Sequence, residues 1–420
     1  MIRLLCLGDA HLGRYPSRVP LNDSDLSVKT VWNRSIDYAI SEQVDAVILT
    51  GDMADNTNSY FEAYGALRQG IWKLSESQIP VVAIAGNHDH AVFPALVESM
   101  SDDNLRFLGS DGVWTETIVK TQSGKSLRCV GWSFPDAHYD RSPLETLHLS
   151  HSDDFTIGIV HGDLDNQAKY APLKRSDMAA QLVDLWLLGH VHAPKLYDDT
   201  RAPVLYPGSL QALDPGEPGI HGPWLITIDQ QNQVHARHLP LASVRYEKLP
   251  INISNRRRME EINIAVTEQL DEFAQELIKS NPELRHLSCR LILSGKTELH
   301  RQLSTEGLIN TEMFDIDVQQ CRVSIDKVST NTAPLLDLHE IAQLNNDPPG
   351  MLARWLLELD QEDDHKLLSI SREATTAIYK SIGFKNLGER EPDPETLQRL
   401  VTQQAMLLLD ELLAQKEENG

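Results

Sequence analysis

The first half of the chain repeats one pattern of hydrophobic and polar positions. An apolar, β-rich run ends abruptly, and a short polar segment that begins with Gly, Asp or His follows it. The pattern occurs five times, in the segments IRLLCLGD, VDAVILTGD, VVAIAGNHD, FTIGIVHGD and LVDLWLLGH. Short runs that are apolar at successive positions are typical of strands buried on both faces.

Segments with helical spacing of apolar residues separate the first three runs, at residues 28–40 and 60–74. Strands that alternate with helices predict an α/β fold, in which a largely buried sheet has helices outside it. Ligands of such sheets gather at the carboxyl ends of the strands. We therefore expect all five polar segments to lie along one edge of the sheet.

The composition changes twice farther along the chain. The Gly- and Pro-rich stretch YPGSLQALDPGEPGIHGPW and the strand WLITID close a first domain, which we place at residues 1–240. A smaller α+β domain is predicted at 241–330, with strands in VRYEKLPINI, SCRLILSG and CRVSIDKV and an amphipathic helix from Arg257 to Ser280. Residues 331–420 are predicted to be helical, and Asp393 and Pro394 are the expected N-cap and first residue of the last helix.

The composition is that of a globular protein. With 420 residues, 41% hydrophobic and 24% charged, two or three domains are expected. No apolar run has the length of a membrane span, and Asp9 and His11 interrupt the apolar start of the sequence, so we expect a cytoplasmic protein. The four cysteines are scattered, which argues against a disulfide framework and against a CxxC zinc site.

The formal net charge of -23 argues against a protein that coats nucleic acid by bulk electrostatics. It does not exclude a nuclease that depends on metal ions, because bound cations would neutralise acidic residues clustered at a metal site. The net charge therefore argues against binding through a broad basic surface, but nucleic acid remains a possible substrate of a metal site.

The five polar segments supply oxygen and imidazole ligands without a thiolate. Their candidate side chains are Asp9, His11, Asp52, Asp55, Asn87, His88, Asp89, His161, His190 and His192. These donors suffice for two six-coordinate sites if one carboxylate bridges the ions and water completes the shells. Such ligation suits Mn²⁺, Fe²⁺ or Mg²⁺ better than a structural zinc site. Two neighbouring metal ions are a common device for phosphate ester cleavage.

These motifs carry a resemblance to a known family. The segments GDAHLG, GDMAD, GNHDH, VHGD and GHVH, in this order, resemble the five signatures of the calcineurin-like metallophosphoesterase superfamily. The stretch from GHVHAPKLY to APVLYPGSLQALDPGEPGIHGPWLITI is similar to the SbcD-type exonucleases of DNA double-strand-break repair, and most of all to their YhaO-like bacterial members. LILSGKTELHRQL is similar to the cap domain of that group. The resemblance implies a β-sandwich flanked by helices, followed by a small α+β cap domain and C-terminal helices.

The resemblance also implies a role for each ligand. Asp9, His11 and His192 would hold the first metal ion, Asn87, His161 and His190 would hold the second, and Asp52 would bridge the two. A water shared by the ions would be deprotonated near neutral pH and would attack the phosphorus in line. His88 would donate a proton to the leaving oxygen or stabilise the transition state.

Three positions beside the ligand motifs, Asp55, Asp89 and His90, are open to two interpretations. They either orient the ligands or are simply polar loop residues, and some relatives have a histidine in place of Asp55. Gly208, in the segment YPGS, matches a family turn near the metals, where glycine would permit close approach of the backbone.

The sequence thus predicts a Mn²⁺-dependent DNA exonuclease of the double-strand-break repair type that hydrolyses phosphodiesters with two metal ions, Fe²⁺ or Mg²⁺ being the other candidates. A phosphodiesterase that acts on nucleotides or other small phosphate esters is the alternative enzyme, and the acidic charge favours it. A non-catalytic, nuclease-like scaffold subunit is the alternative from another class. DNA, an SMC-like coiled-coil ATPase bound through the C-terminal helices, and a second copy of the chain are the partners that the resemblance implies.

Overall fold

The structure is a computed structural model that describes residues 1–20, 23–55, 60–100, 104–165, 170–303, 311–343, 347–359, 366–380 and 391–418. The chain divides into two compact units. The first comprises Met1–Lys248, Leu270–Arg290 and Phe314–Asp326, and the second comprises Leu249–Gln269, Leu291–Met313 and Lys327–Gly420. Each unit thus combines segments that are distant in sequence.

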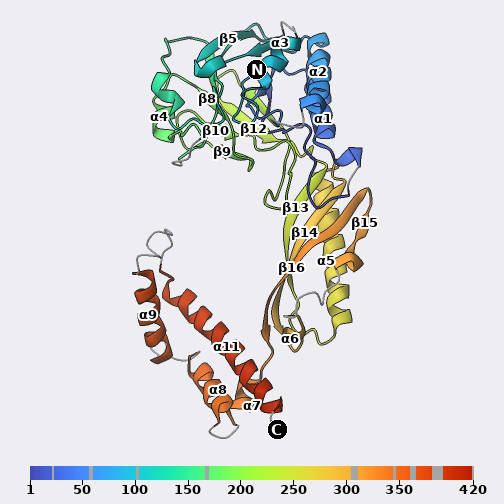
Figure 1. Cartoon of the computed structure of the whole chain (residues 1–420), viewed down its shortest axis with the longest axis vertical. Coiled ribbons are helices and arrows are strands. Elements are labelled where there is room, and N and C mark those ends of the chain that lie inside the picture. Colours follow the sequence, from blue (N-terminus) through green and yellow to red (C-terminus); the bar gives the residue numbers. More distant parts are fainter. Residues whose placement is uncertain are drawn as a thin grey trace. The chain divides into compact units, whose positions relative to one another are not determined.

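The first unit contains two six-stranded sheets (Figure 1). The first sheet has the order β12 (Val234–His238), β11 (Trp224–Ile228), β1 (Ile2–Leu7), β2 (Ala46–Leu49), β3 (Val81–Ala83) and β4 (Leu105–Phe107). The second has the order β5 (Thr115–Lys120), β6 (Ser126–Trp132), β7 (Phe155–His161), β8 (Leu185–Gly189), β10 (Val204–Tyr206) and β9 (Lys195–Tyr197). Strands β1 to β4 are parallel to one another, as are β6, β7, β8 and β10.

Alternate residues of these strands pack on opposite faces of each sheet. Val47 of β2 packs in a core with the helices that cover the first sheet, whereas Ile48 packs in a second core between the two sheets. Ile159 of β7 shares this inner core, and the next residue, Val160, packs on the outer face of the second sheet. Both faces of the central strands are therefore buried, which explains their continuous apolar runs. The predicted β-sandwich flanked by helices is confirmed.

The expectation of a single sheet edge for all five polar segments is wrong. Strands β1, β2 and β3, which precede three of the segments, belong to the first sheet, whereas β7 and β8 belong to the second. The five apolar runs look alike in the sequence because every one of them is buried on both faces. Such a pattern identifies buried strands but does not assign them to one sheet or to two.

The helices of the first unit are α1 (Val28–Ser41), α2 (Tyr60–Glu76), α3 (Phe93–Met100) and α4 (Arg175–Ala179). The first two confirm the helices predicted at 28–40 and 60–74. The α1 helix begins after Ser27, whose hydroxyl accepts a hydrogen bond from the backbone N–H of Thr30 and so caps the helix.

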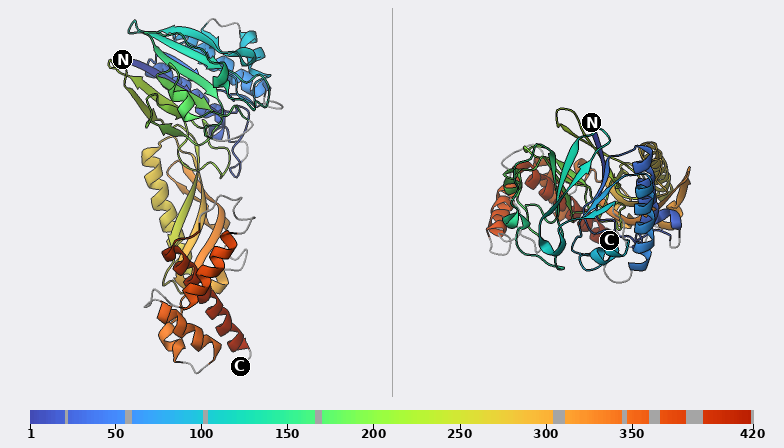
Figure 2. Two further views of the ribbon diagram at one scale, coloured as in Figure 1. Left: turned by 90° about the vertical axis from the view of Figure 1, so that its left-hand side faces the viewer. Right: turned by 90° about the horizontal axis from the view of Figure 1, so that it is seen from above.

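A four-stranded sheet has the order β13 (Val244–Asn252), β14 (His286–Thr297), β16 (Cys321–Pro334) and β15 (Ile316–Val318). The long helix α5 (Met259–Ser280) runs alongside these strands (Figure 2), and the short helix α6 (His300–Leu303) follows β14. Ile262, Val266 and Leu270 of α5 are buried, as the amphipathic pattern of this segment predicts.

The C-terminal helices are α7 (Leu338–Ala342), α8 (Pro348–Leu359), α9 (Lys366–Tyr379) and α11 (Pro394–Glu418). Leu356 of α8 packs with Met406 and Leu409 of α11 in a small apolar core. Asp393 caps α11 as predicted, because its carboxylate accepts a hydrogen bond from the backbone N–H of Thr396 at 2.8 Å. Among the helices that the structure describes, none combines the length with the apolar character that a membrane crossing requires.

Candidate metal centre

The predicted ligands lie at or just after the carboxyl ends of five strands, and four of them have an unusual backbone conformation. Asp9, His11, Asp52 and His190 all have positive φ angles, of 45°, 44°, 51° and 99°. Such left-handed conformations are uncommon for residues other than glycine and concentrate at functional sites, where the surrounding structure must hold them. Here a hydrogen bond joins the loops after β1 and β2, since the backbone N–H of His11 donates to the carbonyl oxygen of Asp52 at 3.0 Å.

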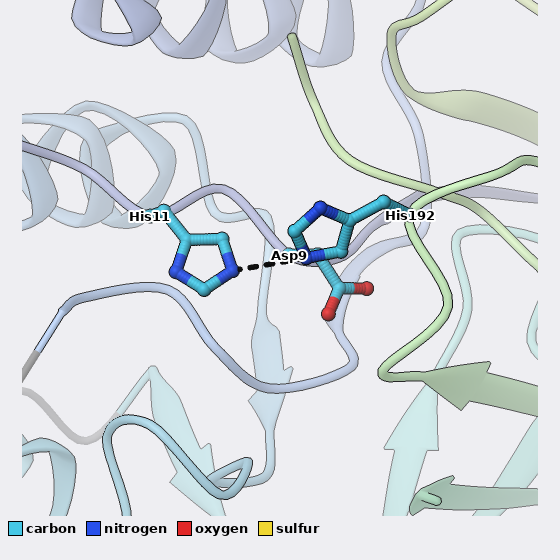
Figure 3. A group of neighbouring side chains, drawn as sticks. All are labelled: Asp9, His11 and His192. Carbon is cyan, nitrogen blue, oxygen red and sulfur yellow. Dashed lines mark hydrogen bonds between the residues drawn. The ribbon is translucent and has the colours of Figure 1, made fainter. Parts of the chain in front are cut away.

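The structure brings Asp9, His11 and His192 into one group (Figure 3), with a potential ligand atom of each within 4.8 Å of the others. This is the set predicted for the first metal ion. Asp9 and His11 are buried, and the Nε2 atoms of His11 and His192 face each other at 3.2 Å.

The protonation of this histidine pair fits a bound cation. The Nδ1 atom of His192 lies 2.6 Å from a carboxylate oxygen of Glu217, so it carries the proton and leaves a lone pair on Nε2. The buried Nδ1 of His11 makes no hydrogen bond and lies 3.8 Å from Asp55. A cation held by both Nε2 atoms would replace the hydrogen bond between them and would let Nδ1 of His11 carry a proton that faces the Asp55 carboxylate.

The set predicted for the second metal ion also meets in space. The side-chain oxygen of Asn87 lies 3.1 Å from Nε2 of His161 and 3.2 Å from Nδ1 of His190. Nδ1 of His161 faces the backbone carbonyl oxygen of Thr50 at 3.0 Å and therefore donates a proton to it. The Nε2 atom of His161 is thereby directed toward oxygen atoms, which is the arrangement of a metal ligand.

Asp52 lies beside both sets. One oxygen of its carboxylate lies 3.2 Å from Nε2 of His161, and the other accepts the backbone N–H of His88 at 2.8 Å. Asp9, Asp52 and His161 also form a group with potential ligand atoms within 4.8 Å of one another. A carboxylate in this position is able to contact cations in both sets, as the prediction of a bridging role requires.

The charges of these groups are strongly coupled. Burial would raise the pKa of Asp52, but the charge of His161 and the hydrogen bond to it lower that pKa below its ordinary range. Burial would lower the pKa of His161, but the charge and the hydrogen bond of Asp52 raise it to about 9. Burial and the charge of His161 lower the pKa of His190 to about 3. These shifts favour the neutral form of His190 and the charged forms of Asp52 and His161, with which a cation would compete.

His88 lies at the rim of the centre, outside the two predicted ligand sets. Its side chain is 48% exposed, and its Nδ1 atom lies 3.2 Å from Asp55. The second oxygen of Asp55 lies 3.4 Å from Nε of Arg14. Asp55 therefore lies beside His88, and also 3.8 Å from Nδ1 of the predicted ligand His11. His88 also forms, with His11 and Asp55, a third group that could hold a metal ion.

Asp89 is fully buried and ties two loops of the centre together. Its carboxylate accepts the backbone N–H groups of Met53 and Gly86, both at 2.7 Å. Burial, followed by the charge of Asp52, raises the pKa of Asp89 to about 7. Asp89 thus fixes the backbone of the loops that carry Asp52 and Asn87.

Sequence reasoning missed Glu217, which lies in the Gly- and Pro-rich loop before β11. The only signal in the sequence is an acidic residue within the segment DPGEPG, which does not distinguish it from a polar loop residue. The expectation for Gly208 in the same loop is confirmed. A Cβ atom at Gly208 would lie 2.6 Å from the carbonyl oxygen of His192, and the φ of 77° favours glycine.

Gly189, at the end of β8, is a second glycine that the centre requires. A Cβ atom there would overlap the carbonyl oxygen of Thr50 and the ring of His161. We expect Gly189→Ala to lower the free energy of unfolding by about 1–3 kcal/mol, the range for overpacking of a filled interior. Urea unfolding measures this change. Gly65→Ala is the matched control, because a Cβ on this helical glycine meets nothing within 4 Å and should raise stability by about 0.5–1 kcal/mol. Equal stability of the two variants would contradict the packing at Gly189.

Comparison with known proteins agrees with the motifs. Residues 2–194 match the calcineurin-like phosphoesterase family, and residues 246–333 match the middle domain of the metallophosphoesterase YhaO. The uncharacterized metallophosphoesterase YhaO of Bacillus subtilis (strain 168) is 26% identical over 267 residues, which are 62% of this chain and 62% of that protein. The resemblance to the YhaO-like branch is confirmed.

Other similarities are weaker. The DNA double-strand break repair protein Mre11 of Archaeoglobus fulgidus is 23% identical over 225 residues, which are 50% of each chain. The chain therefore spans about half to 62% of the length of these two relatives. Among solved structures, TT1561 of Thermus thermophilus has a TM-score of 0.36 and 13% identity, and the match covers 56% of this chain and 98% of that one.

Proposed function

We propose that the chain, of which residues 2–194 match the calcineurin-like phosphoesterase family, is a metal-dependent phosphodiesterase that degrades DNA from its ends. The observation that carries the proposal is the convergence of oxygen and imidazole donors from five strand ends into two adjoining groups. Two divalent cations in such a centre supply charge stabilisation for a phosphate ester and activate water for in-line attack.

The predicted ligands fall into two sets, one for each cation. Asp9, His11 and His192 would hold one cation, Asn87, His161 and His190 the other, and Asp52 would contact both. The neutral amide of Asn87 ligates without adding negative charge, so the centre stays cationic enough to attract a phosphodiester. The donor set contains nitrogen and oxygen without sulfur, which fits Mn²⁺ and also Fe²⁺ or Mg²⁺.

His88 is the candidate proton donor. Its ring is exposed at the rim of the centre, and its Nδ1 atom lies 3.2 Å from a carboxylate oxygen of Asp55, which would accept a proton from it. The Nε2 atom is then the nitrogen that can give a proton to the leaving oxygen. Its position next to Asn87 in the chain would place that proton beside the cations.

Two observations support DNA as the substrate. One is the similarity to the repair protein Mre11 of Archaeoglobus fulgidus. The other is the run of three exposed arginines at residues 256–258, just before α5, which concentrates positive charge in a chain of net charge -23. Arg257 and Arg258, which are 74% and 71% exposed, contact glutamates, but exposed ion pairs of this kind are weak enough to exchange for phosphate.

The acidic charge of the whole chain favours a second candidate, a phosphodiesterase for small esters. Bulk repulsion of a long polyanion would matter little for a substrate with a single phosphate. The two candidate functions use the same metal centre and differ only in the substrate, which is DNA in one and a small phosphate ester in the other.

The test is the release of nucleotides from an end-labelled linear DNA duplex by the purified full-length protein, with a bis-aryl phosphate in parallel. Stepwise loss of the label that requires Mn²⁺ and stops with a chelator is the expected result. An intact duplex together with cleavage of the bis-aryl phosphate would replace DNA by a small ester. If neither compound is cleaved with Mn²⁺, Fe²⁺ or Mg²⁺, the proposed phosphodiesterase is refuted.

A further inference from the structure

Glu217 holds the ring of His192 from outside the centre. Its Oε1 atom lies 2.6 Å from Nδ1 of His192, a short distance typical of a hydrogen bond to a charged acceptor. Its Oε2 atom accepts the backbone N–H of Leu213 at 2.8 Å. The side chain of Glu217 is only 14% exposed, so water competes little for either bond.

The loop that carries Glu217 also holds the backbone of His192. The N–H of Ser209 donates to the carbonyl oxygen of His192 at 2.9 Å, and Gly208 makes this close approach possible. Ser209 also forms a β-bridge with Gly8, the residue before Asp9. One loop therefore fixes both the main chain and the ring of His192, relative to the segment that carries Asp9.

The backbone of Glu217 is itself fixed by the loop. The buried ring of His221 bonds through Nε2 to the backbone carbonyl oxygen of Glu217 at 3.2 Å. The backbone N–H of Glu217 donates to the backbone carbonyl oxygen of Asp214 at 2.9 Å and closes a tight turn. With its backbone held in this way and its Oε2 atom bonded to Leu213, Glu217 has little freedom to adjust to the ring of His192.

The consequence concerns which nitrogen of His192 is able to bind metal. A carboxylate accepts protons only, so Nδ1 must donate and Nε2 must carry the lone pair that is directed at His11. In His161 the backbone carbonyl oxygen of Thr50 accepts the proton of Nδ1 and so leaves Nε2 free to bind metal. No side-chain substitution removes a backbone acceptor. At His192 the acceptor is a side chain, so its contribution can be measured.

We propose that Glu217 is a positioning residue that sets the cation affinity of the Asp9, His11 and His192 group by fixing the ring and the tautomer of His192. The inference rests on the proposed function only in that this group holds a cation. It assigns Glu217 no contact with the substrate.

The experiment is calorimetric titration of the metal-free, full-length protein with Mn²⁺, without substrate. For Glu217→Ala we expect one of the two binding events to weaken by about 10- to 100-fold and the other to stay near the wild-type affinity. Glu217→Gln should weaken the same binding event less, since the amide oxygen of glutamine still accepts the proton of Nδ1 of His192. Glu145→Ala, at an exposed glutamate of the same unit, is the matched control and should bind as the wild type does.

A double-mutant cycle with His192→Ala separates positioning from a general support of the loop. If Glu217 acts through His192, Glu217→Ala should change Mn²⁺ affinity little once His192 is absent. Unchanged affinity in the single variant, equal weakening of both binding events, or an undiminished effect in the His192→Ala background would each overturn the inference. A wild-type protein that binds no Mn²⁺ would instead overturn the metal centre, and the proposed function with it.

Discussion

Asp52→Asn is expected to lower the rate of phosphodiester hydrolysis at least about a thousandfold, which corresponds to about 4 kcal/mol in the activation barrier. The side chain is 2% exposed and lies beside both predicted ligand sets. The substitution removes the negative charge between two cations. It also puts an amide N–H₂ group against either the backbone N–H of His88 or the ring of His161. Initial rates on a bis-aryl phosphate at saturating Mn²⁺ measure the loss.

The matched control is Asp37→Asn, at an aspartate that is 64% exposed and contacts Lys73. It carries the same chemical change far from the ligand groups and should leave the rate unaltered. Full activity of Asp52→Asn would remove Asp52 from the centre. Full function of the same variant in cells, with hydrolysis abolished in vitro, would favour the scaffold alternative over the enzyme.

His88→Ala is expected to lower turnover by about 10²- to 10⁴-fold, the usual contribution of a positioned proton donor. The affinity for Mn²⁺ should stay close to that of the wild type, since His88 lies outside both predicted sets. The measurement pairs kcat on a phosphodiester with calorimetric titration of Mn²⁺. A leaving group that needs no proton, such as a nitrophenolate, should reduce the defect.

The outcome for Mn²⁺ binding decides between two roles of His88, because this residue also forms a possible metal group with His11 and Asp55. Loss of affinity in parallel with turnover would make His88 a ligand. Unchanged turnover would remove it from the mechanism. His151→Ala, at an exposed histidine outside the centre, is the control for the general effect of losing an imidazole.

The candidate ligands could be located from the sequence because each follows an apolar run. A strand that is buried on both faces must be apolar throughout, so the first polar residues after it mark the edge of the sheet. Asp9, Asp52, Asn87, His161 and His190 all stand at such ends. The SMC-like ATPase partner, the homodimer and the domain boundaries stay predictions from the resemblance and the composition.

The side-chain directions of Glu217 and Asp89 could not be predicted from the sequence. Glu217 lies on an irregular loop, and neither strand periodicity nor helix spacing gives its direction. Its partner His192 is 25 residues earlier in the chain. Asp89 stands within the ligand motif, yet its carboxylate is directed at the backbone N–H groups of Met53 and Gly86. A side chain can adopt several rotamers at one position, so a sequence motif identifies the residue but does not show which way its side chain points.

The sequence by itself determined the buried strands, the helices between them and the set of donors at the strand ends, since these follow from local periodicity. The periodicity did not say which donors meet; the family resemblance implied the two sets, and the tertiary structure shows how they come together. His11 and His192 are 181 residues apart in the chain, and His161 reaches Thr50 across 111 residues. These donors come from strands of two different sheets, which pack face to face through a shared apolar core. The packing that buries those faces is therefore what assembles the metal centre.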